Sequence, residues 1–162
     1  MKKGPADAFQ LESFFPYLVR IYYRSVSQSV TEIYEREYKL TVSEWRAMAV
    51  LGNEQPLSAG EIVKRSSIDK VKVSRAIAGL TKAGYLERRV DEDDRRKVAL
   101  QLTRSGQLVF EDLVQKVRQL EEDLLDGFTD SERDSLRNMM ARVRQNAKAI
   151  EEKHKEKSAS GN

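Results

Sequence analysis

The sequence contains no cysteine and a single histidine, and both shortages exclude kinds of chemistry. Without cysteine the chain forms no disulfide, no thiolate zinc site and no thiol redox sensor. The histidine, His154, lies in a lysine-rich segment, where a solvated cation is a simpler interpretation than a catalytic base. The sequence shows no nucleophile–base pair, glycine-rich phosphate loop or clustered set of metal ligands. We therefore expect neither an enzyme nor a protein that binds a metal or a cofactor.

Long apolar runs are missing as well. No run approaches the ~20 residues that a helix needs to span a bilayer, so no membrane partner is expected. The N-terminal segment MKKGPADAFQ has two lysines but no apolar stretch after them, which is unlike a signal peptide. Together with the lack of disulfides, these features favour the cytoplasm. With 40% hydrophobic and 34% charged residues, the 162-residue chain suits one compact domain, or one domain with dimerisation helices.

Basic residues are concentrated in the middle of the chain. The net charge is only +3, but 12 Lys and Arg face 7 Asp and Glu between Ser58 and Arg104, and the remainder is slightly acidic. A polyanion would bind to such a basic segment, although a chance cluster is the alternative.

Helical periodicity and helix-start signals divide the rest of the chain. Apolar residues at helical spacing from Phe9 to Tyr38 predict one long helix that begins or bends at Pro16. Pairs of hydroxyl and carboxylate residues predict three capping boxes, and two further residues resemble simple N-caps. The capping boxes are Thr41–Glu44, Ser58–Glu61 and Thr129–Glu132, and the simple caps are Asp69 and Thr103. The helices predicted after the first span residues 42–51, 59–66, 70–83, 104–126 and 130–157.

Between the fourth and fifth helices the apolar period changes. Residues 85–90 are strand-like, and residues 98–102 alternate as in a half-buried strand, so a β-hairpin with a charged tip at residues 91–96 is expected. The fold class predicted is mainly α with a small β-hairpin wing, a winged helix-turn-helix with long dimerisation helices. We assign residues 1–40 to an N-terminal dimerisation helix, 41–103 to the DNA-binding domain, 104–157 to C-terminal dimerisation helices and 158–162 to a disordered tail.

The helix at residues 70–83 has two unlike faces. In a winged helix-turn-helix, the second helix of the pair reads DNA. Its predicted inward face carries Val73, Ala76, Ile77 and Leu80. The outward face carries Val71, Ser74, Arg75, Ala78 and Lys82, and Lys70 and Lys72 flank its N-terminal end. Small residues allow close approach to the major groove, and the arginine fork matches guanine acceptors or a phosphate. An ordinary solvated face is the alternative, but such a face usually mixes charges.

The predicted wing tip combines arginines with acids. Arg95 and Arg96, with Lys97 beside them, are placed to enter a narrow minor groove. The four acids at residues 91–94 would repel phosphates. We expect Asp94 to pair with Arg96 and fix the loop, which leaves Arg95 projecting. A solvated charged turn is the alternative.

An ordered set of short motifs carries a family resemblance. These motifs are LTVSEWR from Leu40, LSAGEI from Leu57, VSR from Val73, LTKAGYLER from Leu80, DRR from Asp94 and LTRSG from Leu102. In this order and spacing they resemble the MarR (multiple antibiotic resistance regulator) family. The resemblance implies a homodimer built from the terminal helices, a palindromic operator and repression that a small ligand relieves. The family's aspartate-x-arginine wing motif maps onto Asp94 and Arg96. Where members commonly have a hydroxyl residue early in the reading helix, this chain has Val71 and Lys72.

Three long amphipathic helices carry more apolar surface than one small winged helix covers, which favours a homodimer over a monomer that buries them internally. A twofold dimer places two reading helices about one DNA turn apart, ~34 Å. The resemblance also implies an effector crevice between the dimer helices and the DNA-binding lobe. Aromatic walls with an arginine suit a small aromatic or phenolic acid, although core packing is the alternative for each residue. The candidate lining residues are Arg20, Tyr22, Tyr23, Trp45, Arg46 and Met48.

The sequence therefore predicts a sequence-specific DNA-binding transcriptional regulator, a ligand-responsive repressor whose partners are double-stranded DNA, a second copy of the chain and an effector. A protein-interaction module built on the same helices is the rival class. Salt-sensitive binding to duplex DNA distinguishes the two.

Overall fold

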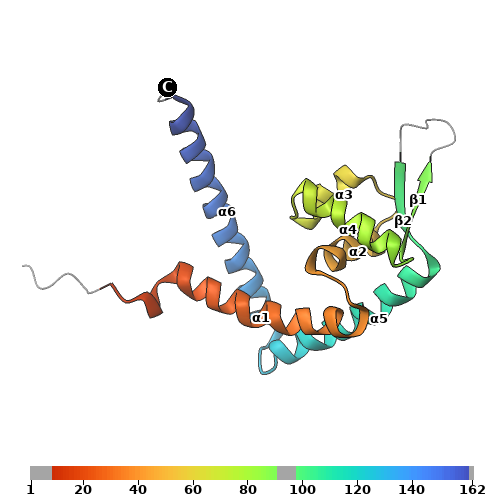
Figure 1. Ribbon diagram of the computed structural model, residues 1–162. Coiled ribbons are helices and arrows are strands. Elements are labelled where there is room, and N and C mark those ends of the chain that lie inside the picture. The colour runs from red at the N-terminus through yellow and green to blue at the C-terminus, as the bar shows by residue number, and fades with distance from the viewer. Residues whose placement is uncertain (1–8, 91–97, 161–162) are drawn as a thin grey trace, which may run out of the picture. The chain divides into compact units, whose positions relative to one another are not determined.

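A computed structural model describes residues 9–90 and 98–160 (Figure 1). The chain divides into two compact units, Met1–Leu120 and Glu121–Asn162. In order, the described elements are a 3-10 helix η1 (Leu11–Ser13), α1 (Phe15–Tyr38), α2 (Val42–Asn53), α3 (Ala59–Ser66), α4 (Lys70–Lys82), β1 (Leu86–Val90), β2 (Val98–Leu102), α5 (Arg104–Leu124) and α6 (Asp130–Ser160). Within these ranges, none of the helices combines the length and the apolar character that crossing a membrane requires. The mainly helical architecture with a small antiparallel sheet is confirmed.

The helices begin where local hydrogen bonds place them. The Thr41 N–H donates to Glu44 Oε2 at 2.8 Å, and the Glu44 N–H donates to Thr41 Oγ1 at 3.3 Å. The same reciprocal bonds occur at Ser58 and at Thr129, so the three predicted capping boxes are confirmed. Pro16 lies in the first turn of α1, where its missing N–H costs nothing.

Several helix and strand boundaries differ from the prediction. α2 runs two residues further, to Asn53, and β1 begins at Leu86 because the Tyr85 N–H donates to the Leu80 carbonyl at the end of α4. α5 ends at Leu124 rather than Asp126, since a turn with Gly127 at φ 79° follows it. α6 continues to Ser160, so three residues assigned to a disordered tail are helical. The Ser158 hydroxyl donates to the His154 carbonyl at 2.9 Å.

The core of the first unit fixes how α4 is held. The side chains of Met48, Leu51, Ile62, Leu80 and Leu113 are completely buried, and they bring α2, α3, α4 and α5 together. β1 and β2 pair antiparallel with Leu86 opposite Leu102. Leu57 adds a bridge to Leu100, with N–H···O distances of 3.0 and 2.8 Å. One face of α4 therefore packs on this core.

The second unit consists of the end of α5, a turn and α6, and the side chain of Arg133 ties the turn to both helices. The Arg133 guanidinium donates to Glu122 Oε2 at 2.6 Å and to the carbonyl oxygens of Leu125 and Phe128 at 3.1 and 3.3 Å. These bonds satisfy backbone groups after the end of α5. None of the described side chains of α6 is buried in this single chain.

Candidate DNA-binding surface

α4 presents two faces, and burial confirms both. Val73, Ala76, Ile77 and Leu80 belong to the core, each less than one-tenth exposed. The seven side chains expected on the outside are all exposed: Lys70, Val71, Lys72, Ser74, Arg75, Ala78 and Lys82. The helical period alone separates these sets, because residues three and four apart share a face.

At the N-terminal end of α4, the acidic side chain of Asp69 is paired within the helix. Asp69 caps the helix by accepting the Lys72 N–H at 2.9 Å, and the Lys72 ammonium lies 3.0 Å from the same carboxylate. These contacts, the backbone one first, hold the pKa of Asp69 below its ordinary value. Within the described residues, no carboxylate forms an ion pair with Lys70, Arg75 or Lys82. The outward face thus stays basic, although Lys72 is partly engaged.

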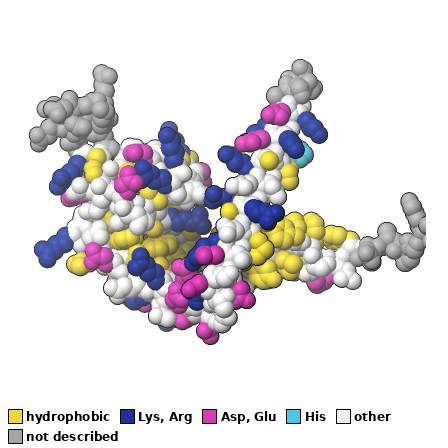
Figure 2. Space-filling model, turned by 180° about the vertical axis from the view of Figure 1, so that it is seen from behind, with side chains coloured by type: hydrophobic (Ala, Val, Ile, Leu, Met, Phe, Trp, Pro, Cys, Tyr) yellow, Lys and Arg dark blue, Asp and Glu magenta, His cyan; other side chains and the backbone are white. Residues whose placement is uncertain are grey.

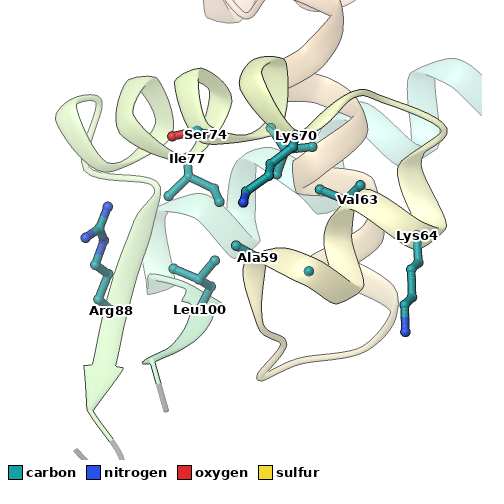
Figure 3. Close-up of a pocket in the computed structure, with 10 residues that line it drawn as sticks. Ala59, Val63, Lys64, Lys70, Ser74, Ile77, Arg88 and Leu100 are labelled. Atoms are coloured by element: carbon teal, nitrogen blue, oxygen red, sulfur yellow. The ribbon is translucent and has the colours of Figure 1, made fainter. Parts of the chain in front are cut away.

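A pocket of about 590 Å³ lies beside α4, between α3 and the sheet (Figure 3). Ala59, Val63, Val73, Ile77 and Leu100 give it apolar walls. Its remaining lining residues include Lys64, Lys70 and Arg88. Figure 3 shows Lys70 and Ile77 reaching from α4 toward the space above Ala59 and Leu100.

Sequence reasoning missed Lys64 and Arg88 as members of this surface. Neither belongs to the helix that the periodicity singled out, and only the fold brings α3 and β1 alongside α4. The one signal that pointed to them was the excess of basic residues between Ser58 and Arg104.

The predicted wing is described only at its base. The antiparallel pairing of β1 and β2 confirms the hairpin. Asp94, Arg95 and Arg96 lie outside the described residues. At the base of the hairpin, Arg88 and Arg89 are exposed on β1, and Arg89 lies 3.9 Å from Glu87.

The six candidate effector residues separate into three groups. Tyr23, Trp45 and Arg46 line one pocket of about 230 Å³ between α1 and α2. Trp45 also stacks on Tyr34, with ring centroids 6.2 Å apart. Arg20 and Tyr22 are exposed on α1 and do not line this pocket.

Met48, the sixth candidate, does not line that pocket. Its side chain is completely buried in the hydrophobic core. Met48 follows Ala47 and precedes Leu51 on the inner side of α2, and both of these residues are buried as well. The pocket-facing side of α2 is instead its first turn, at Val42, Trp45 and Arg46.

A large apolar patch covers the N-terminal half of α1 and the residues before it. Figure 2 shows it as a run of hydrophobic side chains next to the grey N-terminal residues. Its exposed members are Phe9, Leu11, Phe14, Phe15, Val19, Ile21, Tyr22, Tyr23 and Val26. Patches of this kind mark contact surfaces more often than solvated faces.

Comparison with known proteins finds sequence similarity to transcriptional regulators. The MarR family model matches residues 38–97. The regulator PecS of Dickeya dadantii is 29% identical over 121 residues, which are 73% of this chain and 72% of PecS.

Two solved structures share the fold at lower identity. FabT of Streptococcus pneumoniae, solved in complex with DNA, is 20% identical with a TM-score of 0.70, over 87% of this chain and 99% of FabT. BpsR of Bordetella bronchiseptica, whose DNA binding is regulated by 6-hydroxynicotinic acid, is 24% identical with a TM-score of 0.69, over 87% of this chain and 98% of BpsR.

Proposed function

We propose that the chain is a member of the MarR family of DNA-binding transcriptional regulators, and that it is a cytoplasmic repressor that binds a palindromic operator as a homodimer. Its relatives are regulators of transcription rather than enzymes. The observation that carries the proposal is the outward face of α4, which is exposed, basic and made of short or flexible side chains.

α4 enters the major groove in this proposal. Arg75, at the middle of the exposed stripe, contacts a base edge through its guanidinium fork. Lys70 and Lys82, near the two ends of the helix, bind phosphates and set its position, as phosphate contacts generally do. Ser74 and Ala78 allow close approach. Lys72 contributes less, because Asp69 already engages its ammonium.

The wing contact is proposed from the sequence. Arg95 or Arg96 enters the minor groove, and Asp94 shapes the loop. Alanine at either arginine should weaken binding to every duplex, with less change in major-groove sequence preference than alanine at Arg75. An unchanged affinity in both wing variants would contradict this assignment.

The homodimer is proposed from the exposed apolar surface. The N-terminal patch of α1 gathers exposed hydrophobic side chains on one part of the surface, as contact surfaces do. α6 adds exposed Met139, Met140, Val143 and Ile150. In a twofold dimer each patch meets its own copy. We therefore propose that residues 1–40 and 104–157 form the dimer interface and that residues 41–103 bind DNA.

The effector is proposed to be a small aromatic or phenolic acid in the pocket between α1 and α2. Tyr23 and Trp45 supply aromatic walls, and Arg46 supplies a cation for a carboxylate. The aromatic acid that regulates BpsR supports this choice of chemistry. Because α2 packs on α4, an occupant of this pocket is placed to alter how α4 is held.

Duplex binding tests the regulator proposal. We expect affinity for a duplex recovered from a random library to fall steeply with salt. Arg75→Ala should lower that affinity roughly ten- to hundredfold, the value of one good base contact. Arg118→Ala, at an exposed arginine of α5, is the matched control and should have little effect. Binding to no duplex at low salt would refute the proposal.

Effector release is tested with the protein–DNA complex. Aromatic acids, including 6-hydroxynicotinic acid, are titrated while the bound fraction of a labelled duplex is measured. Arg46→Gln should raise the concentration needed for release, whereas Arg20→Gln should not, since Arg20 does not line the pocket. Equal responses of the two variants would place the effector elsewhere.

A further inference from the structure

Val71 is an apolar side chain that the described part of the fold leaves largely exposed. It is 60% exposed, while Val73, two residues later, is 1% exposed. Of the described side chains between residues 43 and 107, it is the only large hydrophobic one that stands exposed. Because the Val71 side chain contributes little to the core, we expect it to contact a partner outside the chain.

The position of Val71 on α4 is specific. Val71, Arg75, Ala78 and Lys82 form one stripe at steps of four, three and four residues, opposite the buried face. Side chains one turn apart on a helix have Cβ atoms about 5–6 Å from each other. Base pairs in a duplex rise by about 3.4 Å, so two such side chains reach neighbouring base pairs or pairs one step further apart.

The charges around Val71 limit what it can contact. Lys70 and Lys72 flank it in the chain, and Arg75 lies one turn away. Such surroundings suit a polyanion and disfavour an apolar protein surface. The required partner is therefore negatively charged overall and apolar at one point. In the major groove, that point is the C5-methyl group of thymine.

We propose that Val71 reads a thymine methyl group within one or two base pairs of the base contacted by Arg75. This inference rests on the proposed entry of α4 into the major groove. The first turn of a reading helix is the part that contacts base edges, and Val71 lies in that turn. A valine side chain donates no hydrogen bond, so it distinguishes thymine from the other bases by burying a methyl group alone.

The test truncates each partner of the contact in turn: thymine loses its C5-methyl group, and Val71 loses its two γ-methyl groups. Each thymine of the duplex recovered from a random library is replaced in turn by uracil, which differs only in lacking the C5-methyl group. With the wild-type protein, replacement at one thymine of each half-site should lower affinity about fourfold per half-site. With Val71→Ala, affinity for the thymine duplex should fall by a similar factor, and the difference between thymine and uracil should vanish.

Two further variants make the result specific. Leu108→Ala truncates a side chain that is 61% exposed on α5, and it should keep the preference for thymine. Val71→Ile should keep it as well. A preference for thymine that persists in Val71→Ala, or a duplex in which no uracil lowers wild-type affinity, would overturn the inference. Failure to recover any duplex would instead refute DNA binding itself.

Discussion

At the scale of single residues, Gly106 is held against a backbone carbonyl. A Cβ atom there would lie 2.0 Å from the Tyr85 oxygen, which cannot move aside as a side chain can. The same carbonyl accepts the Thr103 N–H at 3.0 Å, and the Thr103 hydroxyl accepts the Gly106 N–H at 3.0 Å. The start of α5 is thereby fastened to the end of α4 and the start of β1.

Gly106→Ala should therefore lower the free energy of unfolding by about 2 kcal/mol, in spite of the better helix propensity of alanine. Gly60→Ala is the matched control, since its Cβ would meet nothing closer than 3.9 Å. That change should stabilise the chain by about 0.5–1 kcal/mol. Urea unfolding of both variants measures the difference, and effects of the same sign would contradict the close approach.

Asp69 also acts at this scale, because it caps α4 and pairs with the Lys72 ammonium, which is then less able to make the proposed contact with a phosphate. Asp69→Asn keeps an oxygen that can accept the Lys72 N–H, and it releases the Lys72 ammonium from its ion pair. We expect duplex affinity at low salt to rise and the salt dependence to steepen by up to about one counterion. A salt titration with wild type and variant measures this, and a weaker affinity in the variant would contradict it.

At the scale of elements, the end of α1 is joined to α5 by a polar cluster. The Tyr38 hydroxyl donates to Asp112, and the Lys116 ammonium lies between Asp112, at 2.8 Å, and Glu37. Lys116 also stands 5.6 Å from the centre of the Tyr38 ring. The hydrogen bonds from Lys116 and then from Tyr38 lower the pKa of Asp112 from its ordinary 3.8.

This cluster predicts a pH dependence of stability. A carboxyl whose pKa is lower in the folded state stabilises the fold above its unfolded pKa, and the benefit is lost as the pH falls through the folded pKa. As the pH falls from about 6 to about 3, wild type should lose stability more steeply than Asp112→Asn. Tyr38→Phe should fall between the two. Urea midpoints across this range provide the measurement, and parallel curves would count against the cluster.

At the scale of the whole molecule, the exposed patch of α1 predicts assembly. Phe15, Val19, Tyr22 and Val26 share one stripe of the helix and are all exposed. Two charges in that stripe, Val19→Glu with Val26→Glu, should convert a dimer of twice 18.6 kDa into a monomer. Gln28→Glu is the control, since Gln28 lies nine residues after Val19 and is exposed on the opposite face of α1.

Sedimentation equilibrium measures the mass, and the same samples are then tested for operator binding. The monomeric variant should lose most of its affinity for a palindromic duplex, because it can occupy only one half-site at a time. A doubly charged variant that remains dimeric would show that this stripe is not the interface.

Local sequence was enough to determine where most helices begin and which faces they present. The capping boxes at Thr41, Ser58 and Thr129 close within four residues, so no distant contact decides them. The two faces of α4 follow from the helical period alone. Binding to DNA could be inferred from that face together with an ordered set of motifs.

Only the tertiary structure decided which residues from different elements meet. It buried Met48 in the core, placed Arg46 rather than Arg20 in the pocket between α1 and α2, and brought Lys64 and Arg88 beside α4. These outcomes depend on contacts between residues far apart in the chain, and neither helical period nor capping chemistry carries that information. For Val71 both kinds of information are needed. The local sequence determines its place on the stripe of α4, and the tertiary structure determines that its side chain is exposed.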